Sequence, residues 1–310
     1  MKGRIVSMKG LELSRCFFED YGEAFRNDEL LPFASIGLVG NGSECFGFDD
    51  DISQDHDFQP GFCVWVDYDA SQEVFHALTD AYQSLPISYL GYQRYDKAID
   101  GEKRRGVFYT ADFYRNMIGL PRAPQTISEW LSVPDYALAA ATNGELFTDH
   151  ATDFSYIRNT LLHGMPHDIR LKRIAKHVSL MAQSGQYNVA RCLKHGEIAA
   201  SRLALSEFTV HAASVVYHLN DKYPPFYKWL LRGIRELSML SELTTELSAL
   251  LLSIDDKDIL RRIEKISHII LTVLQEQNLT DGQESYLEIH AHRIMERIQN
   301  RDIRSLHIMA

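Results

Sequence analysis

The spacing of apolar residues divides the chain into two parts of different character. In residues 1–150, short apolar runs bounded by Gly, Pro or Asn alternate with segments of helical spacing, which predicts a mixture of strands and helices. The predicted strands cover residues 34–40, 57–66, 106–110 and 145–148, and the predicted helices cover 11–27 and 70–84. Pro60-Gly61 interrupts the second strand, as is typical of a bulge or an edge position. Thr110 is the predicted N-cap of a helix after the third strand.

After about residue 151 the periodicity is helical throughout. Predicted helices cover residues 153–163, 168–184, 196–219, 226–252, 257–276 and 283–300. Gly185 and Pro224-Pro225 are the predicted breaks. The apolar stripe of 257–276 is a packing face, directed either into the chain or against a second copy in a homodimer. The pattern therefore predicts an α/β N-terminal domain (1–150) followed by an all-helical C-terminal domain (151–310).

Composition places the chain among ordinary globular proteins. Its 310 residues are 45% hydrophobic and 24% charged, which excludes a disordered or collagen-like chain. Apolar runs fall short of the roughly 18 residues that indicate a membrane span, so we expect no membrane partner. The start lacks the apolar core of a secretory signal. The four cysteines form no C-x-x-C pair, so a disulfide framework or zinc site is not expected and cytoplasmic localisation is the prediction.

The formal charge of −10 is unevenly distributed. Residues 1–150 carry 12 basic and 24 acidic side chains, whereas residues 151–310 carry 20 basic and 18 acidic side chains. This balance disfavours a uniformly basic nucleic-acid face, and DNA is not an expected partner. One predicted helix carries four basic residues that leave an RNA acceptor open: Arg170, Lys172, Arg173 and Lys176.

The candidate chemistry lies in residues 40–58, GNGSECFGFDDDISQDHDF. Gly42 lacks a Cβ, so the backbone there can approach a phosphate, and Ser43 adds a hydroxyl donor at a predicted helix N-terminus. Asp55 and Asp57 alternate along the predicted strand and present two carboxylates on one face. Because adjacent like charges are costly, a divalent cation such as Mg²⁺ is the expected partner of the pair. The competing interpretations are a solvated acidic turn for the aspartates and a helix cap for Ser43. Residues 49–51 are predicted to be a solvated or capping cluster.

This arrangement resembles the signature of the polymerase-β-like nucleotidyltransferase superfamily, a Gly-Ser pair followed after a short spacer by Asp-x-Asp. Here eleven residues separate Ser43 from Asp55. The wider chain resembles a bacterial family of unknown function within that superfamily, over residues 40–62, 142–147, 181–193 and 223–229.

The resemblance implies an α+β fold, with a small mixed sheet and flanking helices followed by the helical domain that closes over nucleotide and acceptor. It also implies a reaction in which an acceptor hydroxyl attacks the α-phosphate of a nucleoside triphosphate, ATP in the first place, and releases pyrophosphate. Asp55 and Asp57 would bridge two Mg²⁺ ions, and Ser43 would hold the β- and γ-phosphates. Active members add a third carboxylate, for which Glu145 is the first candidate and Asp112 the second. The acceptor is an unidentified small molecule, protein or RNA end.

Three cations of the helical domain complete the predicted site. Arg191, Lys194 and Lys228 are hypothesised to bind triphosphate across the cleft, against the alternative of ordinary surface charges. An alternative function is a non-catalytic nucleotide-binding regulatory module that lacks the third carboxylate. A further one is an interaction scaffold built on the helical half, which would bind no nucleotide.

Overall fold

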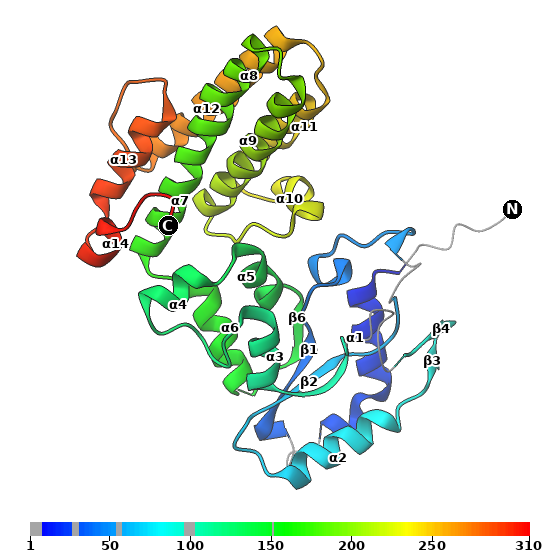
Figure 1. Cartoon of the computed structure of the whole chain (residues 1–310). Coiled ribbons are helices and arrows are strands. Elements are labelled where there is room, and N and C mark those ends of the chain that lie inside the picture. Colours follow the sequence, from blue (N-terminus) through cyan, green and yellow to red (C-terminus); the bar gives the residue numbers. More distant parts are fainter. Residues whose placement is uncertain (1–7, 27–30, 54–57, 96–102, 151) are drawn as a thin grey trace, which may run out of the picture. The chain divides into compact units, whose positions relative to one another are not determined.

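The computed structural model describes residues 8–26, 31–53, 58–95, 103–150 and 152–310. The fold is α+β, as predicted (Figure 1). The chain divides into two compact units, Met1–Gly164 and Met165–Ala310. The first unit therefore includes helix α6 (Asp153–His163), which the sequence pattern assigned to the helical domain. In the described part of the chain, no helix combines the length and the apolar character needed to cross a membrane.

The first unit is built on a four-stranded sheet in the order β5-β2-β1-β6. The central strand β1 runs antiparallel to both of its neighbours, whereas β2 and β5 are parallel, so the sheet is mixed. The strands are β1 (Ala34–Leu38), β2 (Cys63–Val66), β5 (Gly106–Tyr109) and β6 (Glu145–Thr148). The predicted strand 57–66 is thus shorter than expected, because the chain bends at Pro60 and Gly61 has a φ of +141°. A separate two-stranded hairpin, β3 (Ser88–Tyr89) and β4 (Tyr92–Gln93), was not predicted.

Helices cover both faces of the sheet, as Figure 1 shows. Ile36 and Val64 point into an aromatic core shared with Phe17 of α1 (Gly10–Tyr21) and with α2 (Gln72–Gln83). Trp65 points to the other face, where its ring stacks on Phe154 of α6 at 3.8 Å between centroids. That face is also covered by α3 (Thr110–Ile118). Because β1 and β2 are buried on both faces, these two strands appear in the sequence as largely apolar runs.

Other details of the first unit differ from the sequence prediction. The helix predicted for 11–27 ends at Tyr21 and continues as a 3₁₀ turn over Gly22–Phe25. Tyr109, rather than Thr110, is the N-cap of α3, and its side chain makes no capping hydrogen bond. Two short helices, α4 (Ile127–Ser132) and α5 (Asp135–Thr142), were not predicted.

The helical unit contains a continuous helix where the sequence predicted a break. Helix α7 (His167–Met181) passes into a π-helix, η5 (Ala182–Val189), and then into α8 (Ala190–Lys194). The predicted break at Gly185 is therefore wrong. A Cβ on Gly185 would lie 2.2 Å from the Phe208 ring of α9 (Ile198–Leu219), so this glycine serves close helix packing instead.

The remaining helices follow the apolar pattern more closely. The predicted helix 257–276 is α12 (Asp256–Glu276), and its apolar stripe is buried by neighbouring helices of the same unit. The segment predicted as one helix, 226–252, forms two helices, α10 (Tyr227–Ile234) and α11 (Leu243–Leu252). Leu240 lies between them with a φ of +63°, which is incompatible with a right-handed helix. Residues 283–300 likewise give α13 (Leu287–Arg297), with α14 (Arg301–Ser305) after it.

Candidate functional site

One edge of the sheet gathers segments that are far apart in the sequence. β1 ends at this edge, whereas β2, β5 and β6 begin there, because Gly37 pairs with Cys63, Cys63 with Gly106, and Leu38 with Glu145. The Gly-Ser segment after β1, the basic segment before β5 and the start of β6 therefore lie at the same edge.

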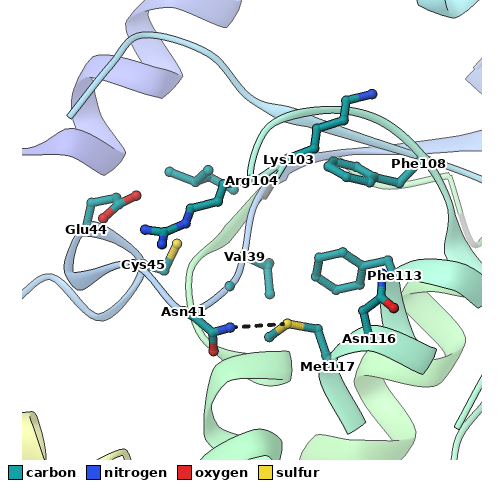
Figure 2. A pocket seen from close by; sticks show the side chains of 13 residues that line it. Val39, Asn41, Glu44, Cys45, Lys103, Arg104, Phe108, Phe113, Asn116 and Met117 are labelled. Atoms are coloured by element: carbon teal, nitrogen blue, oxygen red, sulfur yellow. Dashed lines mark hydrogen bonds between the residues drawn. The ribbon is translucent and has the colours of Figure 1, made fainter. Parts of the chain in front are cut away.

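A pocket of about 650 Å³ opens at this edge, entirely within the first unit (Figure 2). Figure 2 shows Glu44 and Arg104 on one side of it and the rings of Phe108 and Phe113 on the other. The lining residues are Leu38, Val39, Gly40, Asn41, Gly42, Glu44, Cys45, Lys103, Arg104, Phe108, Phe113, Asn116 and Met117. Polar and cationic groups thus face an apolar wall, an arrangement that suits a ligand with an anionic part and an aromatic part.

The loop that follows β1 is held by the turn that precedes β6. The side-chain amide of Asn143 donates to the carbonyl of Gly40 at 2.7 Å and accepts from the Gly40 N–H at 3.0 Å. The next residue, Gly144, donates its N–H to the Cys45 carbonyl at 2.8 Å. Arg158 of α6 supports this turn by donating to the Thr142 carbonyl at 2.5 Å. The loop that would approach a phosphate is therefore braced at Gly40 and at Cys45.

Gly42 lines the pocket, and Ser43 opens a four-residue 3₁₀ turn (Ser43–Phe46) rather than the predicted α-helix. A Cβ on Gly42 would lie 2.3 Å from a carboxylate oxygen of Glu44. Glu44 in turn forms a buried ion pair with Arg105 at 3.0 Å, with 15% and 4% of the two side chains exposed. The absence of a side chain at Gly42 therefore accommodates this ion pair in addition to leaving the backbone accessible.

Two carboxylates of the acidic run 49–51, for which a solvated loop or a capping cluster was predicted, bind backbone N–H groups. Asp49 is buried and accepts the N–H of Gly10 at 2.7 Å, which caps the first turn of α1. Lys9 lies 3.5 Å from the same carboxylate. Asp50 accepts the N–H of Ser53 at 3.1 Å within its own turn. These carboxylates hold the loop and the first helix in place.

The predicted metal ligands Asp55 and Asp57 lie outside the described residues. Of the two candidate third carboxylates, Glu145 begins β6 at the sheet edge where the pocket opens. Glu145 is not one of the residues that line the pocket, and its carboxylate pairs with Arg15 of α1. Asp112 lies in the first turn of α3, after the far end of β5, and pairs with Arg115 of its own helix. The topology therefore puts Glu145, and not Asp112, at the edge where the Gly-Ser loop lies.

The pocket contains two cations to which the sequence analysis gave no role. Lys103 and Arg104 belong to the segment that leads into β5, and both line the pocket. The Lys103 ammonium lies 5.0 Å from the centre of the Phe108 ring and donates to the Val107 carbonyl at 2.9 Å. The available signal was the run of basic residues directly before the predicted strand 106–110. Asn143 was missed as well, because its partner Gly40 lies 103 residues earlier.

Two thiols lie at the site, and neither is available as a nucleophile. Burial raises the pKa of the Cys63 thiol to about 12 and the pKa of the Cys45 thiol well above its usual value. Both groups are therefore neutral thiols at physiological pH, and thiolate chemistry is not expected in this pocket.

The predicted cations of the helical unit are exposed. Arg191 donates to the Tyr187 hydroxyl at 3.2 Å, and the Lys228 ammonium lies 5.8 Å from the Trp229 ring. Lys194 ends α8 and is also exposed. Their assignment to the triphosphate stays a prediction.

The basic stripe of α7 is not the exposed face that the sequence suggested. Lys172 is 1% exposed, and its ammonium donates to the carbonyls of His307, Ile308 and Ala310. Arg173 is 8% exposed, and Arg170 pairs with Asp221. This stripe therefore offers no continuous surface to RNA.

Comparison with known proteins adds one partial match. The model of a protein family described as a domain of unknown function (DUF4037) matches residues 130–230, about a third of the chain. This segment contains the Asn143-Gly144-Glu145 turn but not the Gly-Ser loop. No curated protein and no solved structure matches the chain.

Proposed function

We propose that this protein is a Mg²⁺-dependent nucleotidyltransferase that moves a nucleotide onto an acceptor hydroxyl, with ATP as the expected donor and AMP as the transferred group. The observation that carries the proposal is the Gly42-Ser43 loop, which lies at the end of β1, is held there by Asn143, and borders a pocket with Lys103 and Arg104. The Asp55-x-Asp57 pair follows Ser43 after a spacer of eleven residues. A glycine loop, cations and paired carboxylates together match the needs of a metal-bound triphosphate.

The pocket suits a nucleotide in size and in chemistry. Its volume of about 650 Å³ falls within the range of small-molecule sites, and its wall of Phe108 and Phe113 offers apolar contact to a base. The Gly42 segment, Lys103 and Arg104 would receive the phosphates. A second hollow of about 460 Å³ shares Asn41, Asn116 and Met117 with the first, and an acceptor would approach through it.

In the proposed reaction the acceptor oxygen forms a bond to the α-phosphorus while the bond from that phosphorus to the bridging β-oxygen breaks. Pyrophosphate leaves, and the hydroxyl proton passes to a carboxylate or to solvent. Asp55 and Asp57 would hold Mg²⁺, which neutralises charge on the phosphates when it is bound. Hard oxygen ligands suit this ion, and the carboxylate of Glu145 lies at the same edge, whereas both nearby cysteines are neutral thiols.

A second function is favoured by one contact, the ion pair between Glu145 and Arg15. A carboxylate already engaged by a guanidinium is a poorer metal ligand and a weaker base. With Glu145 held in this way, the protein would bind nucleotide as a regulatory module and turn it over little or not at all. Turnover by the wild type separates the two functions, and Arg15→Ala tests the contact itself, because turnover should rise in this variant if the ion pair is what keeps Glu145 from acting.

The deciding experiment is a calorimetric titration of ATP, GTP, CTP and UTP, with and without Mg²⁺. We expect metal-dependent binding of one triphosphate to the wild type, and its loss in Asp55→Asn/Asp57→Asn. Asp80→Asn, which changes an exposed carboxylate on α2, is the matched control and should bind as the wild type does. Failure of every triphosphate to bind the folded wild type would refute both functions and favour a scaffold. Pyrophosphate release in a screen of acceptors then distinguishes the enzyme from the module.

A further inference from the structure

One end of the helical unit carries a group of exposed aliphatic side chains. Helix α9 begins at this end, and the loop between α11 and α12 lies beside it (Figure 1). A hydrogen bond of 2.9 Å from the Arg202 guanidinium of α9 to the Ser253 carbonyl joins the helix to the loop. We call the five exposed residues at this end the aliphatic patch: Ile198, Leu203, Leu251, Leu252 and Ile254.

The hydrogen bond of Arg202 brings the two halves of the patch together. Ile198 lies one turn before Arg202 on the same face of α9, because residues four apart are neighbours on a helix. Leu252 and Ile254 are the residues on either side of Ser253, whose carbonyl accepts from Arg202. The aliphatic groups of α9 and of the loop therefore form one surface.

This surface is not explained by packing within the unit. The exposed fractions of Leu252 and Ile254 are 82% and 89%, whereas Leu247 of α11 and Ile259 of α12 are buried. A single exposed aliphatic side chain is ordinary, but a group of them is typical of a surface that contacts another molecule. The aliphatic patch is therefore a candidate interface.

Exposed charges differ between the two sides of the patch. Basic residues outnumber acidic ones beside Ile198, and acidic residues outnumber basic ones beside Ile254. The charged residues concerned are Arg191, Lys194 and Glu197 in α8 and the turn after it, and Asp255, Asp256 and Lys257 at the start of α12. The patch thus has a basic side and an acidic side.

We propose that the aliphatic patch is the contact surface of a homodimer. A two-fold axis that runs between the two sides places the aliphatic groups of both copies together and sets the acidic side of each copy opposite the basic side of the other. This charge complementarity favours a second copy as the occupant. An anionic membrane is disfavoured, because Asp255 and Asp256 follow directly after Ile254 and would be repelled.

The dimer surface is separate from the pocket of the proposed function, which is lined by residues of the first unit. The proposal therefore does not depend on nucleotide binding. For Arg191 and Lys194, a place at the rim of this surface is an alternative to the predicted contact with triphosphate.

The first test measures the mass of the full chain by analytical ultracentrifugation over a range of concentrations. We expect a reversible dimer with twice the monomer mass of 35.5 kDa. Leu252→Ser/Ile254→Ser changes two exposed side chains, so it should fold as the wild type does and weaken dimerisation by more than about 100-fold. Ile87→Ser is the matched control, because it removes a 74% exposed side chain of the first unit and should leave the dimer unchanged.

A second test uses charge swaps to examine the two-fold arrangement. Lys194→Glu and Asp256→Lys should each dimerise poorly alone, because like charges then face each other. A mixture of the two variants should form a heterodimer, since opposite charges face each other again at both ends of the interface.

Three results would overturn the proposal. They are a monomeric wild type, a dimer that survives Leu252→Ser/Ile254→Ser, and a mixture of the two charge variants that stays monomeric. Binding of a monomeric wild type to vesicles of anionic lipid, lost in Leu252→Ser/Ile254→Ser, would assign the patch to a membrane instead.

Discussion

The side-chain amide of Asn143 forms two hydrogen bonds with the backbone of Gly40, since it donates to the carbonyl and accepts from the N–H of the same glycine. Only a primary amide side chain combines both roles in this geometry. The contact joins the loop after β1 to the turn before β6, and it fixes the shape of the pocket rim.

Replacing Asn143 should loosen the loop. We expect Asn143→Ala to lower the free energy of unfolding by about 1–3 kcal/mol, because both backbone groups of Gly40 lose their partner. Asn143→Asp should be as damaging, since a carboxylate keeps the acceptor but faces the Gly40 carbonyl without a donor. Urea unfolding measures the stability, and ATP titration measures the effect on the pocket. If Asn143→Asp changed neither the free energy of unfolding nor the affinity for ATP, the two hydrogen bonds of Asn143 would not be what holds the loop.

Gly144 should tolerate no side chain. Its φ is +63°, and a Cβ would lie 1.9 Å from the Leu38 carbonyl oxygen, a backbone atom that cannot move away. We expect Gly144→Ala to destabilise the first unit severely or to prevent its folding. Gly119 is the matched control, because its φ is +77° with open space around the missing Cβ. Gly119→Ala should cost only about 1–2 kcal/mol, from backbone strain alone. Equal melting temperatures for the two variants would contradict this account.

The buried pair of Glu44 and Arg105 should be strongly coupled. Arg105→Met leaves the Glu44 carboxylate buried without its guanidinium, which should cost about 3–5 kcal/mol. The double variant Glu44→Gln/Arg105→Met should lose less than the sum of the two single variants. Arg115→Met is the control, because it breaks an exposed pair on α3 and should cost about 0–1 kcal/mol. Additive losses in the cycle would show that the two side chains act independently.

Asp67 should make the first unit more stable at mildly acidic pH. Its carboxylate accepts the Asp153 N–H at the start of α6, and burial raises its pKa to about 6. A carboxyl whose folded pKa is raised stabilises the fold below its unfolded pKa, near 3.9, and this contribution is lost as pH rises through about 6. Asp67→Asn keeps the acceptor oxygen without the charge, so its melting temperature should exceed that of the wild type at neutral pH.

The comparison between the two proteins at different pH values provides the check on Asp67. The advantage of Asp67→Asn should shrink when both melting curves are recorded near pH 4, where the wild-type carboxyl is protonated in the fold. A constant advantage from pH 4 to pH 7.5 would mean that the charge of Asp67 is not the cause.

Local chemistry determined most of the elements of this protein. Apolar periodicity specified α6 and, to within one residue, α12. The buried face of a helix is formed by residues three and four positions apart, so a short stretch of sequence is enough to predict it. Short runs rich in apolar residues specified β1 and β5 for the same reason, and the short segment Glu-Leu-Phe-Thr specified β6. The turn at Gly42-Ser43 was also predicted, since turns depend on local residue type. For Asp49 the prediction left a solvated loop and a capping cluster open, and its cap on Gly10 joins residues that are 39 positions apart.

Tertiary structure alone decided what surrounds those elements. The continuation of α7 past Gly185 depends on the Phe208 ring, which fills the space where a Cβ would be. Three contacts join segments that are distant in the sequence: the hydrogen bonds of Asn143 with Gly40, the ion pair of Glu145 with Arg15, and the contact of His177 with His211. No local pattern encodes such contacts, because they arise only when sheet register and helix packing bring the segments together. The sequence by itself therefore determined which residues are candidates for the chemistry. The fold decided that Asn143 holds the loop at Gly40 and that Arg15 pairs with the Glu145 carboxylate.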